Sequence, residues 1–514
     1  MSQLYDLLLI SPCNTKLGRF KRFVPRSVPI SVGIIAGFLR KYGFSAKIID
    51  QELVDINTNS IDGFLRQCKK PHIVGISVMT ANVASGYEIA SAIKSVDKNA
   101  TVIFGGIHAT VMPDEILKDK NVDFIVKGEA EYTFLNLIQQ IKGGQIELDS
   151  LENVGFRKNG EIYFTKSSTK MVDVNDVPMF PYDMYDLSKY NLGFILTSRG
   201  CPFDCIFCSQ RVITKRRYRY ISSERVIEEL DYLINRLKQP NITFFDDYFT
   251  GNKERVFELC SMIQERGFHK KASFGVQTRG DSINRELMEA MRAANFNSLM
   301  FGVETASEDL MKLINKNETV QENVDAIKLA KEMGFTVEAT FIYGFPTETF
   351  DDRFKAFSLS REIGIDRARF NNATPYPGTQ MYEMVKNKIK IEPKWVNFSP
   401  ATAVTAGIKK KHPLPYVPEG TTEKELEGTI LLSNLLFYFN ISNLNKLFNT
   451  KQGGSGKWFE VSKKELLSLN TVFNLLLLTF TVFLRTFDCL LLSSNCRRFF
   501  LKAIKNNPIK EDIC

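Results

Sequence analysis

Short apolar runs alternate with helical segments along most of this 514-residue chain, and this alternation restricts the fold more than any other feature. In the first part of the chain, strands are expected at 4–11, 46–49, 73–78, 101–104 and 125–126, with helices at 31–42 and 84–96. Strands that alternate with helices form parallel sheets covered by helices. Residues 1–145 are therefore expected to form a doubly wound, Rossmann-like α/β domain, with its ligand beyond the carboxyl ends of the strands.

A second block of the same alternation begins at residue 194. Strands are expected at 194–198, 241–245, 272–277, 298–303, 336–342 and 367–371, and helices near 223–237, 252–266, 283–293, 319–333 and 350–363. Six such units predict a partial (β/α)6 barrel over residues 191–385, in which chemistry belongs at the carboxyl ends of the strands. The connector 146–190 carries an Asn-Gly hairpin at 156–164. The region 386–514 is expected to be mainly helical.

Three cysteines, Cys201, Cys205 and Cys208, follow the first expected barrel strand within the loop Arg199–Gln210. Thiolates at this spacing can bind three irons of a 4Fe–4S cluster. An electron-transfer cluster has four cysteine ligands, so the fourth iron would be open to another molecule. Zinc is the alternative, but it requires a fourth Cys or His nearby, and the four histidines of the chain lie far away in sequence.

The C-x3-C-x2-C spacing, with the aromatic Phe207 before the last cysteine, resembles the cluster motif of radical S-adenosylmethionine (SAM) enzymes. The resemblance implies that the open iron chelates the amino and carboxylate groups of SAM. It further implies reductive cleavage of SAM to methionine and a 5′-deoxyadenosyl radical, which abstracts a substrate hydrogen. An external one-electron donor such as flavodoxin or ferredoxin is then required.

Acidic and polar residues follow successive barrel strands. Paired acids such as Asp246 and Asp247 can cap a helix, bind a metal or accept hydrogen bonds from an ammonium group, and the resemblance favours the amino group of SAM. Glu304 could accept hydrogen bonds from the ribose hydroxyls. The backbone after Gly344 could lie along the adenine, next to the backbone near Phe207. The other predicted SAM contacts are Gln277 and Glu348.

The loops after three N-terminal strands, 77–80, 105–110 and 127–133, resemble in order and spacing the cobalamin-binding domain that precedes many radical SAM domains. The resemblance implies contacts with the corrin or its nucleotide tail from Ser77, Thr80, Gly105, Gly106 and His108. His108 has an alternative as an ordinary loop or helix-cap residue.

Cobalamin domains of the methionine-synthase type carry an Asp-x-His-x-x-Gly loop whose histidine binds cobalt. The corresponding loop here, 12–18, contains no histidine, which implies an open lower face or a ligand other than histidine. Cys13 in this loop is interpreted as a buried structural thiol rather than a cobalt ligand.

An apolar stretch, Val472–Leu492, approaches the length of a membrane span but is interrupted by Arg485 and Asp488, and the basic segment Arg497–Lys502 follows it. Three alternatives are a core helical hairpin, an interfacial helix held by anionic lipid and a true span. A substrate-facing lid could be formed by Trp395, Tyr416 and the segment 431–439.

The net charge of +9 is spread along the chain, so no nucleic-acid partner is expected. The basic run 215–220 is interpreted either as a solvated loop or as a clamp on an anionic ligand.

Nine cysteines without a disulfide pattern and no recognisable signal peptide predict a reducing cytoplasm. Membrane association on the cytoplasmic face through the C-terminal region is kept as an alternative.

The combined resemblance to cobalamin-dependent radical SAM enzymes implies methylation of an unactivated carbon in a small, lipid-like or polycyclic substrate. The alternative within enzymes is a cyclase or ring-rearranging enzyme that transfers no methyl group, as in anaerobic tetrapyrrole ring formation. A non-catalytic cobalamin- or cluster-binding sensor is a further alternative. A tRNA methylthiotransferase is disfavoured, because it needs three more cluster cysteines and the N-terminal domain offers only Cys13 and Cys68.

Overall fold

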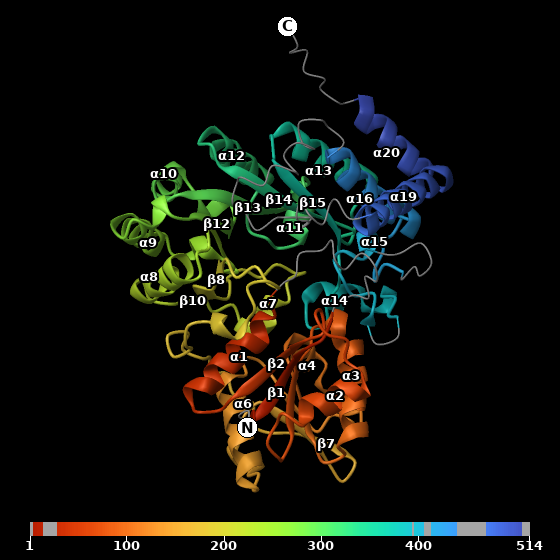
Figure 1. Cartoon of the computed structure of the whole chain (residues 1–514). Helices are drawn as coiled ribbons and strands as arrows, with labels where there is room; N and C mark the ends of the chain where they lie inside the picture. The colour runs from red at the N-terminus through yellow and green to blue at the C-terminus, as the bar shows by residue number, and fades with distance from the viewer. Residues whose placement is uncertain (1–3, 14–27, 393–394, 406–412, 439–468, 506–514) are drawn as a thin grey trace.

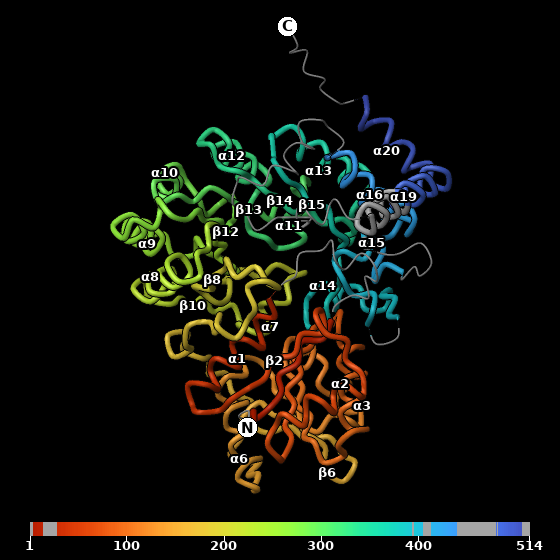
Figure 2. Tube along the Cα trace, in the orientation of Figure 1, coloured from red at the N-terminus to blue at the C-terminus, as the bar shows by residue number. Residues whose placement is uncertain are grey.

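The computed structural model describes residues 4–13, 28–392, 395–405, 413–438 and 469–505. The N-terminal sheet domain lies at one end of the molecule, and the barrel lies above it in the view of Figure 1. The last two helices, within residues 469–505, lie on the outer side of the barrel, far from the N-terminal domain. The tube in Figure 2 follows the same course from residue 28 through both domains.

The N-terminal sheet has seven strands in the order β2-β1-β3-β4-β5-β6-β7. The first five in this order are parallel: β2 Ala46–Asp50, β1 Leu7–Ser11, β3 Ile73–Ser77, β4 Thr101–Gly105 and β5 Phe124–Val126. The helices are α1 Ile30–Lys41, α2 Thr58–Leu65, α3 Val83–Val96, α4 Ile107–Val111, α5 Pro113–Leu117 and α6 Glu131–Gly143. The expected doubly wound domain is confirmed.

Alternate residues of β1 pack into different cores, which explains its uninterrupted apolar sequence. Leu7 and Leu9 belong to the core that includes α1 and α6 side chains, whereas Leu8 and Ile10 belong to the core that includes α3 side chains. All four are nearly inaccessible to solvent. A strand buried on both faces has no polar alternation, and a continuous apolar run therefore marks a parallel sheet.

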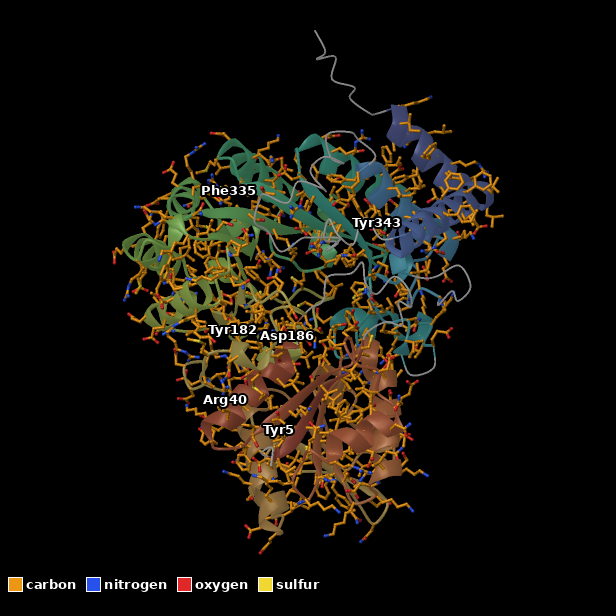
Figure 3. The ribbon with its side chains drawn as sticks, in the orientation of Figure 1. Tyr5, Arg40, Tyr182, Asp186, Phe335 and Tyr343 are labelled. Carbon is orange, nitrogen blue, oxygen red and sulfur yellow. The ribbon has the colours of Figure 1, made fainter. Side chains whose placement is uncertain are left out.

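The hairpin expected in the connector is part of this sheet. Its strands, β6 Val154–Lys158 and β7 Glu161–Phe164, extend the sheet antiparallel to β5. The connector beyond it packs on the barrel through Tyr182, labelled in Figure 3, whose ring lies against that of Phe194. The covalent link between the domains thus begins inside one sheet and ends against the other.

The barrel strands are parallel and adjacent in chain order: β8 Phe194–Ile195, β11 Asn241–Phe244, β12 Ser273–Thr278, β13 Phe296–Glu304, β14 Thr336–Tyr343 and β15 Arg367–Asn372. The helices between them are α8 Ser223–Asp231, α9 Lys253–Glu265, α10 Arg285–Ala293, α11 Glu308–Leu313, α12 Val320–Glu332 and α13 Phe350–Glu362. The chain between β8 and α8 forms a two-stranded ribbon, β9 Ser198–Arg199 with β10 Arg219–Tyr220, and α7 Gln210–Thr214. The expected partial (β/α)6 barrel is confirmed.

A helix rather than a strand covers the open edge of β15. In α16, Glu423–Tyr438, the Asn434 amide donates to the Phe370 carbonyl (2.8 Å) and accepts from its N–H (3.2 Å). The Tyr438 hydroxyl donates to the Ala368 carbonyl (2.9 Å) and accepts from the Ala368 N–H (3.1 Å). Four residues of helix rise about 6.0 Å and two residues of strand about 6.6 Å, so side chains at this helical spacing match alternate strand residues.

Helices α19 Leu469–Leu492 and α20 Ser494–Lys505 pack on α16. Arg485 pairs with Glu427 of α16 at 2.5 Å, and Asp488 pairs with Lys424. The two charges that interrupt the apolar stretch therefore face α16. Within the described ranges, no helix is both long and apolar enough to cross a bilayer. The C-terminal region also contains α14 Gln380–Val385 and α15 Thr402–Thr405.

The expected lid is wrong for the residues that can be placed. Trp395 is buried in the core of the N-terminal domain, Leu431 in the barrel core, and Tyr416 packs in a small core with Ile206. These side chains hold the C-terminal region onto both domains, so they are not available to cover a substrate. Phe439 lies outside the described residues.

Candidate active site between the two sheets

The three motif cysteines lie on the loop bracketed by the β9–β10 ribbon, at the carboxyl end of β8. All three thiols are unbonded and partly exposed. Burial raises the pKa of Cys205 to about 12, against the opposing effect of the Lys316 charge. Burial also raises the pKa of Cys201 and of Cys208. These thiols become thiolates when a metal replaces the proton, so the donor set fits iron ligation.

The zinc alternative gains no support from the geometry. Among the described residues, no group of three or more His, Cys, Asp or Glu side chains is close enough to hold one metal ion. A single zinc requires such a group. The cysteines of a 4Fe–4S cluster bind different irons, so three separated thiols on one loop fit that cluster.

The paired acids after β11 anchor the start of this loop. Asp246 is buried and accepts hydrogen bonds from the Thr197 N–H (2.6 Å), the Thr197 hydroxyl (2.5 Å) and the Ser198 N–H (3.1 Å). Asp247 accepts from the Gly200 N–H (2.9 Å) and from the Gln210 amide (2.6 Å). The expected contact of Asp246 with SAM is therefore not supported, because its oxygens are directed into the loop.

Gly200, directly before Cys201, has a φ of 88°. A Cβ atom at this position would overlap the Arg217 carbonyl oxygen across the loop. Both the left-handed backbone and the close approach require glycine. The position of Cys201 thus depends on this residue and on its hydrogen bond to Asp247.

A cluster of buried charges lies beside the cysteines at the ends of β12 and β13. Lys316 pairs with Glu304 (3.3 Å) and Glu318 (2.9 Å), and Arg279 lies 3.6 Å from Glu318. Glu304 has a φ of 64°, and the register of β13 shifts at this residue. Such backbone strain, of order 1–3 kcal/mol, concentrates at functional sites. Sequence analysis included Glu304 but missed Arg279 as a site residue, together with Lys316 and Glu318.

The remaining expected SAM contacts, Phe207, Gln277, Gly344 and Glu348, differ in their surroundings. Phe207 and the segment after β14 do meet, since the rings of Phe207 and Phe345 lie 5.6 Å apart. Gln277 has an exposed side chain. Glu348, in contrast, is buried, accepts from the Gly344 N–H (2.5 Å) and lies 3.4 Å from Arg353. Glu348 therefore braces the loop after β14 rather than facing a ligand.

Tyr343 and Arg353 connect this loop to the C-terminal region. The hydroxyl of Tyr343, labelled in Figure 3, lies 3.1 Å from that of Ser433 on α16. Arg353, completely buried, pairs with Glu425 of α16 at 2.5 Å as well as with Glu348. Burial raises the pKa of Glu348 to about 8. Helix α16 thus supports the end of β14 as well as the edge of β15.

A cavity of about 410 Å³ lies between the two sheets. Its floor includes Ser77, Gly105 and Gly106, at or just beyond the carboxyl ends of β3 and β4, and its opposite wall includes Arg199 and Gln210 from either end of the cysteine loop. Its remaining lining is mostly apolar. Gly106 has a φ of 93°, and a Cβ there would lie 2.6 Å from the Val78 carbonyl oxygen. A glycine floor and apolar walls fit the flat base and nucleotide tail of a corrinoid.

Thr80 and His108 do not line this cavity. His108 is fully buried, its Nδ1 lies 3.2 Å from the Thr80 hydroxyl, and its ring centroid is 5.6 Å from that of Trp395. Glu115 accepts hydrogen bonds from Trp395 Nε1 (2.9 Å). Although burial opposes it, the neighbouring His108, whose Nε2 lies 3.7 Å away, and the hydrogen bond from Trp395 lower the pKa of Glu115. In this structure Thr80 and His108 instead lie where the C-terminal segment packs on the N-terminal domain, and their expected contact with the corrin stays a prediction.

A network of four charged side chains joins the two domains beside the cavity. Arg199 lies 2.6 Å from Glu131 and 3.6 Å from Glu129, and Arg219 makes two hydrogen bonds to Glu129 (2.5 and 2.9 Å). Although burial opposes it, Glu131 and Glu129 raise the pKa of the Arg199 guanidinium. We name this set the interdomain network. In the sequence, its acidic residues belong to the Gly-Glu-Ala-Glu segment after β5, and its arginines lie on either side of the three cysteines.

The interdomain network includes Arg219, which belongs to the basic run 215–220. Arg219 is committed to Glu129, and Arg216 lies 3.6 Å from Asp204 within the cysteine loop. Arg219 therefore helps to hold the loop in place, whereas Arg216 is exposed, as are Lys215 and Arg217, in agreement with the solvated-loop interpretation. Cys13 is partly exposed and donates to Glu52 (2.7 Å), and residues 14–18 of its loop lie outside the described residues.

Comparison with known proteins agrees with this geometry. The model of the radical SAM superfamily matches residues 195–359, and that of the B12 binding domain matches residues 22–138. The uncharacterized methyltransferase PH0819 of Pyrococcus horikoshii is 31% identical over 414 residues, covering 79% of this chain and 88% of that protein.

Anaerobic magnesium-protoporphyrin IX monomethyl ester cyclase of Rubrivivax gelatinosus is 27% identical over 382 residues, covering 71% of this chain and 67% of the cyclase. The fold resembles that of the radical SAM methyltransferase TsrM from Kitasatospora setae, solved with cobalamin and a [4Fe–4S] cluster, with a TM-score of 0.63, 18% identity and 75% of each chain covered. The chain belongs to the radical SAM enzymes that carry a B12-binding domain.

Proposed function

We propose that this protein is a C-methyltransferase that uses a 4Fe–4S cluster, SAM and cobalamin to methylate an unactivated carbon of an organic substrate. The observation that carries the proposal is the shared cavity, because glycines of the B12-type domain and residues of the cysteine loop line the same space. In this proposal the two cofactor sites are neighbours, because Arg199 and Gln210 flank the cysteines in sequence and also line the cavity. The 31%-identical relative is named as a methyltransferase, which favours methyl transfer.

The chain's own residues have separate roles in this proposal. Cys201, Cys205 and Cys208 hold the cluster, while Asp247 holds the loop that carries them. Residues Phe207, Gln277, Glu304 and Gly344, with Asp247, are the proposed SAM contacts, and Ser77, Gly105 and Gly106 are the proposed cobalamin contacts. When bound, the cluster and SAM supply radical chemistry and cobalamin supplies a methyl group. The apolar cavity walls keep water from the reacting groups.

A second cavity, of about 210 Å³, supports an apolar substrate. It shares Ile34, Arg199 and Gln210 with the first cavity and reaches Phe245 and Asp247 at the end of β11. Most of its lining is apolar, including valine, leucine and phenylalanine side chains. We propose that a lipid-like or polycyclic substrate lies here, against the shared wall. The cluster is reduced from outside, and flavodoxin or ferredoxin is the proposed donor.

A cyclase is the second candidate, favoured by the 27% identity to the magnesium-protoporphyrin cyclase. The test uses anaerobically reconstituted protein, SAM labelled with deuterium in its methyl group, and extracts of the source cells as substrate. Methyl transfer predicts a product that carries the labelled methyl group, together with 5′-deoxyadenosine. A new product without the label would favour cyclisation.

The matched pair of variants is Cys205→Ala and Cys260→Ala. Cys260 is buried in α9, outside the cysteine loop. The first variant is expected to lose 5′-deoxyadenosine formation, and the second to retain it. Wild-type protein that binds cluster and SAM without cleaving SAM would contradict any enzymatic role.

A further inference from the structure

A stripe of large apolar side chains is exposed along α19. Phe480, Phe483, Leu484, Phe487 and Leu491 follow the spacing i, i+3, i+4, i+7 and i+11, which places them on one side of the helix. Their relative exposure is 56%, 63%, 36%, 51% and 60%, respectively. Single exposed apolar residues are ordinary, but a continuous stripe of this kind marks an interaction surface.

The stripe continues onto α20, where the exposed surface becomes basic. Leu492, the last residue of α19, and Leu501 and Ile504 of α20 are all more than half exposed. Arg497 and Lys505 are exposed on the same side of α20 as these two side chains. The sequence of α20 contains four basic residues and no acidic one. We name the apolar stripe and these basic side chains the C-terminal face.

The orientation of α19 is fixed by polar contacts on its other side. Arg485 donates to the Val404 carbonyl (3.1 Å) and pairs with Glu427, and Asp488 pairs with Lys424. Cys489 on that side is buried against α16. Rotating α19 to bury its phenylalanines would expose these charges and break their pairs. The stripe therefore faces outward as a consequence of the fold.

We propose that the C-terminal face docks on an anionic phospholipid bilayer. The phenylalanine and leucine side chains would enter the boundary between headgroups and acyl chains, with α19 parallel to the membrane plane. Arg497 and Lys505 would lie at the level of the lipid phosphates, where each basic side chain contributes to binding. The charge pattern selects lipid over a second copy of the chain, because a twofold contact would bring two basic α20 helices together.

The C-terminal face thus makes the membrane association considered from the sequence specific to one surface and to anionic lipid. Docking of this face does not depend on the reaction that the enzyme catalyses. Binding is measured by flotation of the full-length protein with vesicles of phosphatidylcholine, with or without about one third phosphatidylserine. Wild-type protein is expected to float with the anionic vesicles, weakly with the neutral ones, and less as salt is raised.

The test variant is Phe483→Ser with Phe487→Ser, which changes only exposed side chains. Its affinity for anionic vesicles is expected to fall at least about tenfold. The matched control is Leu187→Ser, which removes an equally exposed leucine (51%) from the connector and is expected to bind like wild type. Circular dichroism melting of all three proteins checks that folding is unchanged.

Three results would overturn the proposal. One is wild-type protein that does not float with anionic vesicles, and another is equal flotation of the double variant. The third is a wild-type dimer in lipid-free solution that the double variant abolishes, because the C-terminal face would then be a contact between copies. Since no measurement requires turnover, failure here leaves the methyltransferase proposal standing, and the reverse also holds.

Discussion

The interdomain network makes a quantitative prediction about Glu131. The Glu131→Gln substitution removes the charge that lies 2.6 Å from Arg199, within a network whose side chains are 4–20% exposed. Removing one partner of a buried ion pair costs about 3–5 kcal/mol. Arg199 keeps Glu129 at 3.6 Å, and glutamine still accepts a hydrogen bond. We therefore expect a cost of about 2 kcal/mol, equal to about 30-fold in an equilibrium constant.

The perturbed equilibrium is the docking of the cysteine loop on the N-terminal domain. Arg199 precedes Cys201 by two residues, and it pairs in register with Arg219 across the β9–β10 ribbon. Hydrogen exchange of cofactor-free protein measures this docking directly, since amides of the ribbon exchange when it opens. In Glu131→Gln, exchange in residues 198–220 is expected to accelerate by about 30-fold, while β12 to β14 remain protected.

Turnover supplies an independent measurement of the same perturbation. If docking aligns the two cofactor sites, Glu131→Gln lowers the amount of methylated product formed per 5′-deoxyadenosine, whereas general destabilisation lowers both together. The control is Glu161→Gln on the exposed strand β7, which is expected to change neither measurement. Unchanged exchange in residues 198–220, with an unchanged product ratio, would refute the coupling argument.

Three further substitutions test other parts of the molecule. Gly200→Ala places a Cβ against the Arg217 carbonyl, so iron incorporation after reconstitution is expected to fall to the level of Cys205→Ala; full iron content would contradict the steric argument. Trp395→Ala removes a buried ring and the hydrogen bond to Glu115, and its melting temperature is expected to fall by an amount equivalent to about 3–5 kcal/mol; an unchanged melting curve would show that the segment is not docked. The Tyr182 hydroxyl lies 2.7 Å from the Phe194 carbonyl and 2.8 Å from Glu229, and with one proton to donate it can satisfy both only if Glu229 is protonated. Burial raises the pKa of Glu229 to about 7. The folded protein therefore holds this proton more tightly than the unfolded chain does. The free energy of unfolding should decline as pH rises from about 4.5 to 7, at up to about 1.4 kcal/mol per pH unit. Glu229→Gln is expected to flatten that part of the stability profile, and an identical slope in both proteins would place the proton elsewhere.

Strands such as β1 and β3 could be predicted from the sequence because they bury both faces and therefore appear as continuous apolar runs. Barrel strand β15 instead alternates buried and partly exposed residues. Strand β3 was expected at 73–78 and is found at Ile73–Ser77. The short helices α4 and α5 escaped prediction, since five residues contain too little periodicity to recognise. The hairpin at 156–164 was recognised from its Asn-Gly turn, but its pairing with β5 is a long-range contact without a local signal.

Site residues could be predicted where function depends on local sequence, and much less where it depends on charge pairing across the fold. The cysteine spacing and the Gly105–Gly106 pair are local, and the structure places the glycine pair in the same cavity as Arg199 and Gln210, which flank the cysteines in sequence. The partners of acidic residues are not local. Glu348 pairs with Arg353 and Asp246 with backbone N–H groups of another strand end, so carboxylates that resemble ligand contacts in sequence are structural braces. The packing of His108 on Trp395 could not be predicted, because Trp395 lies 287 positions later in the chain.

The contact between α16 and the last barrel strand has a consequence for how this enzyme can change over evolutionary time. Asn434 and Tyr438 satisfy the backbone groups of Ala368 and Phe370 at that edge. A seventh strand would have to match the twist and register of the whole barrel, whereas two helical side chains need only the correct spacing. The outward side of the C-terminal region takes no part in these edge contacts or in the buried contacts of α16 with the barrel. Its outer surface can be remodelled for a new location or a new substrate while the radical-generating barrel stays the same.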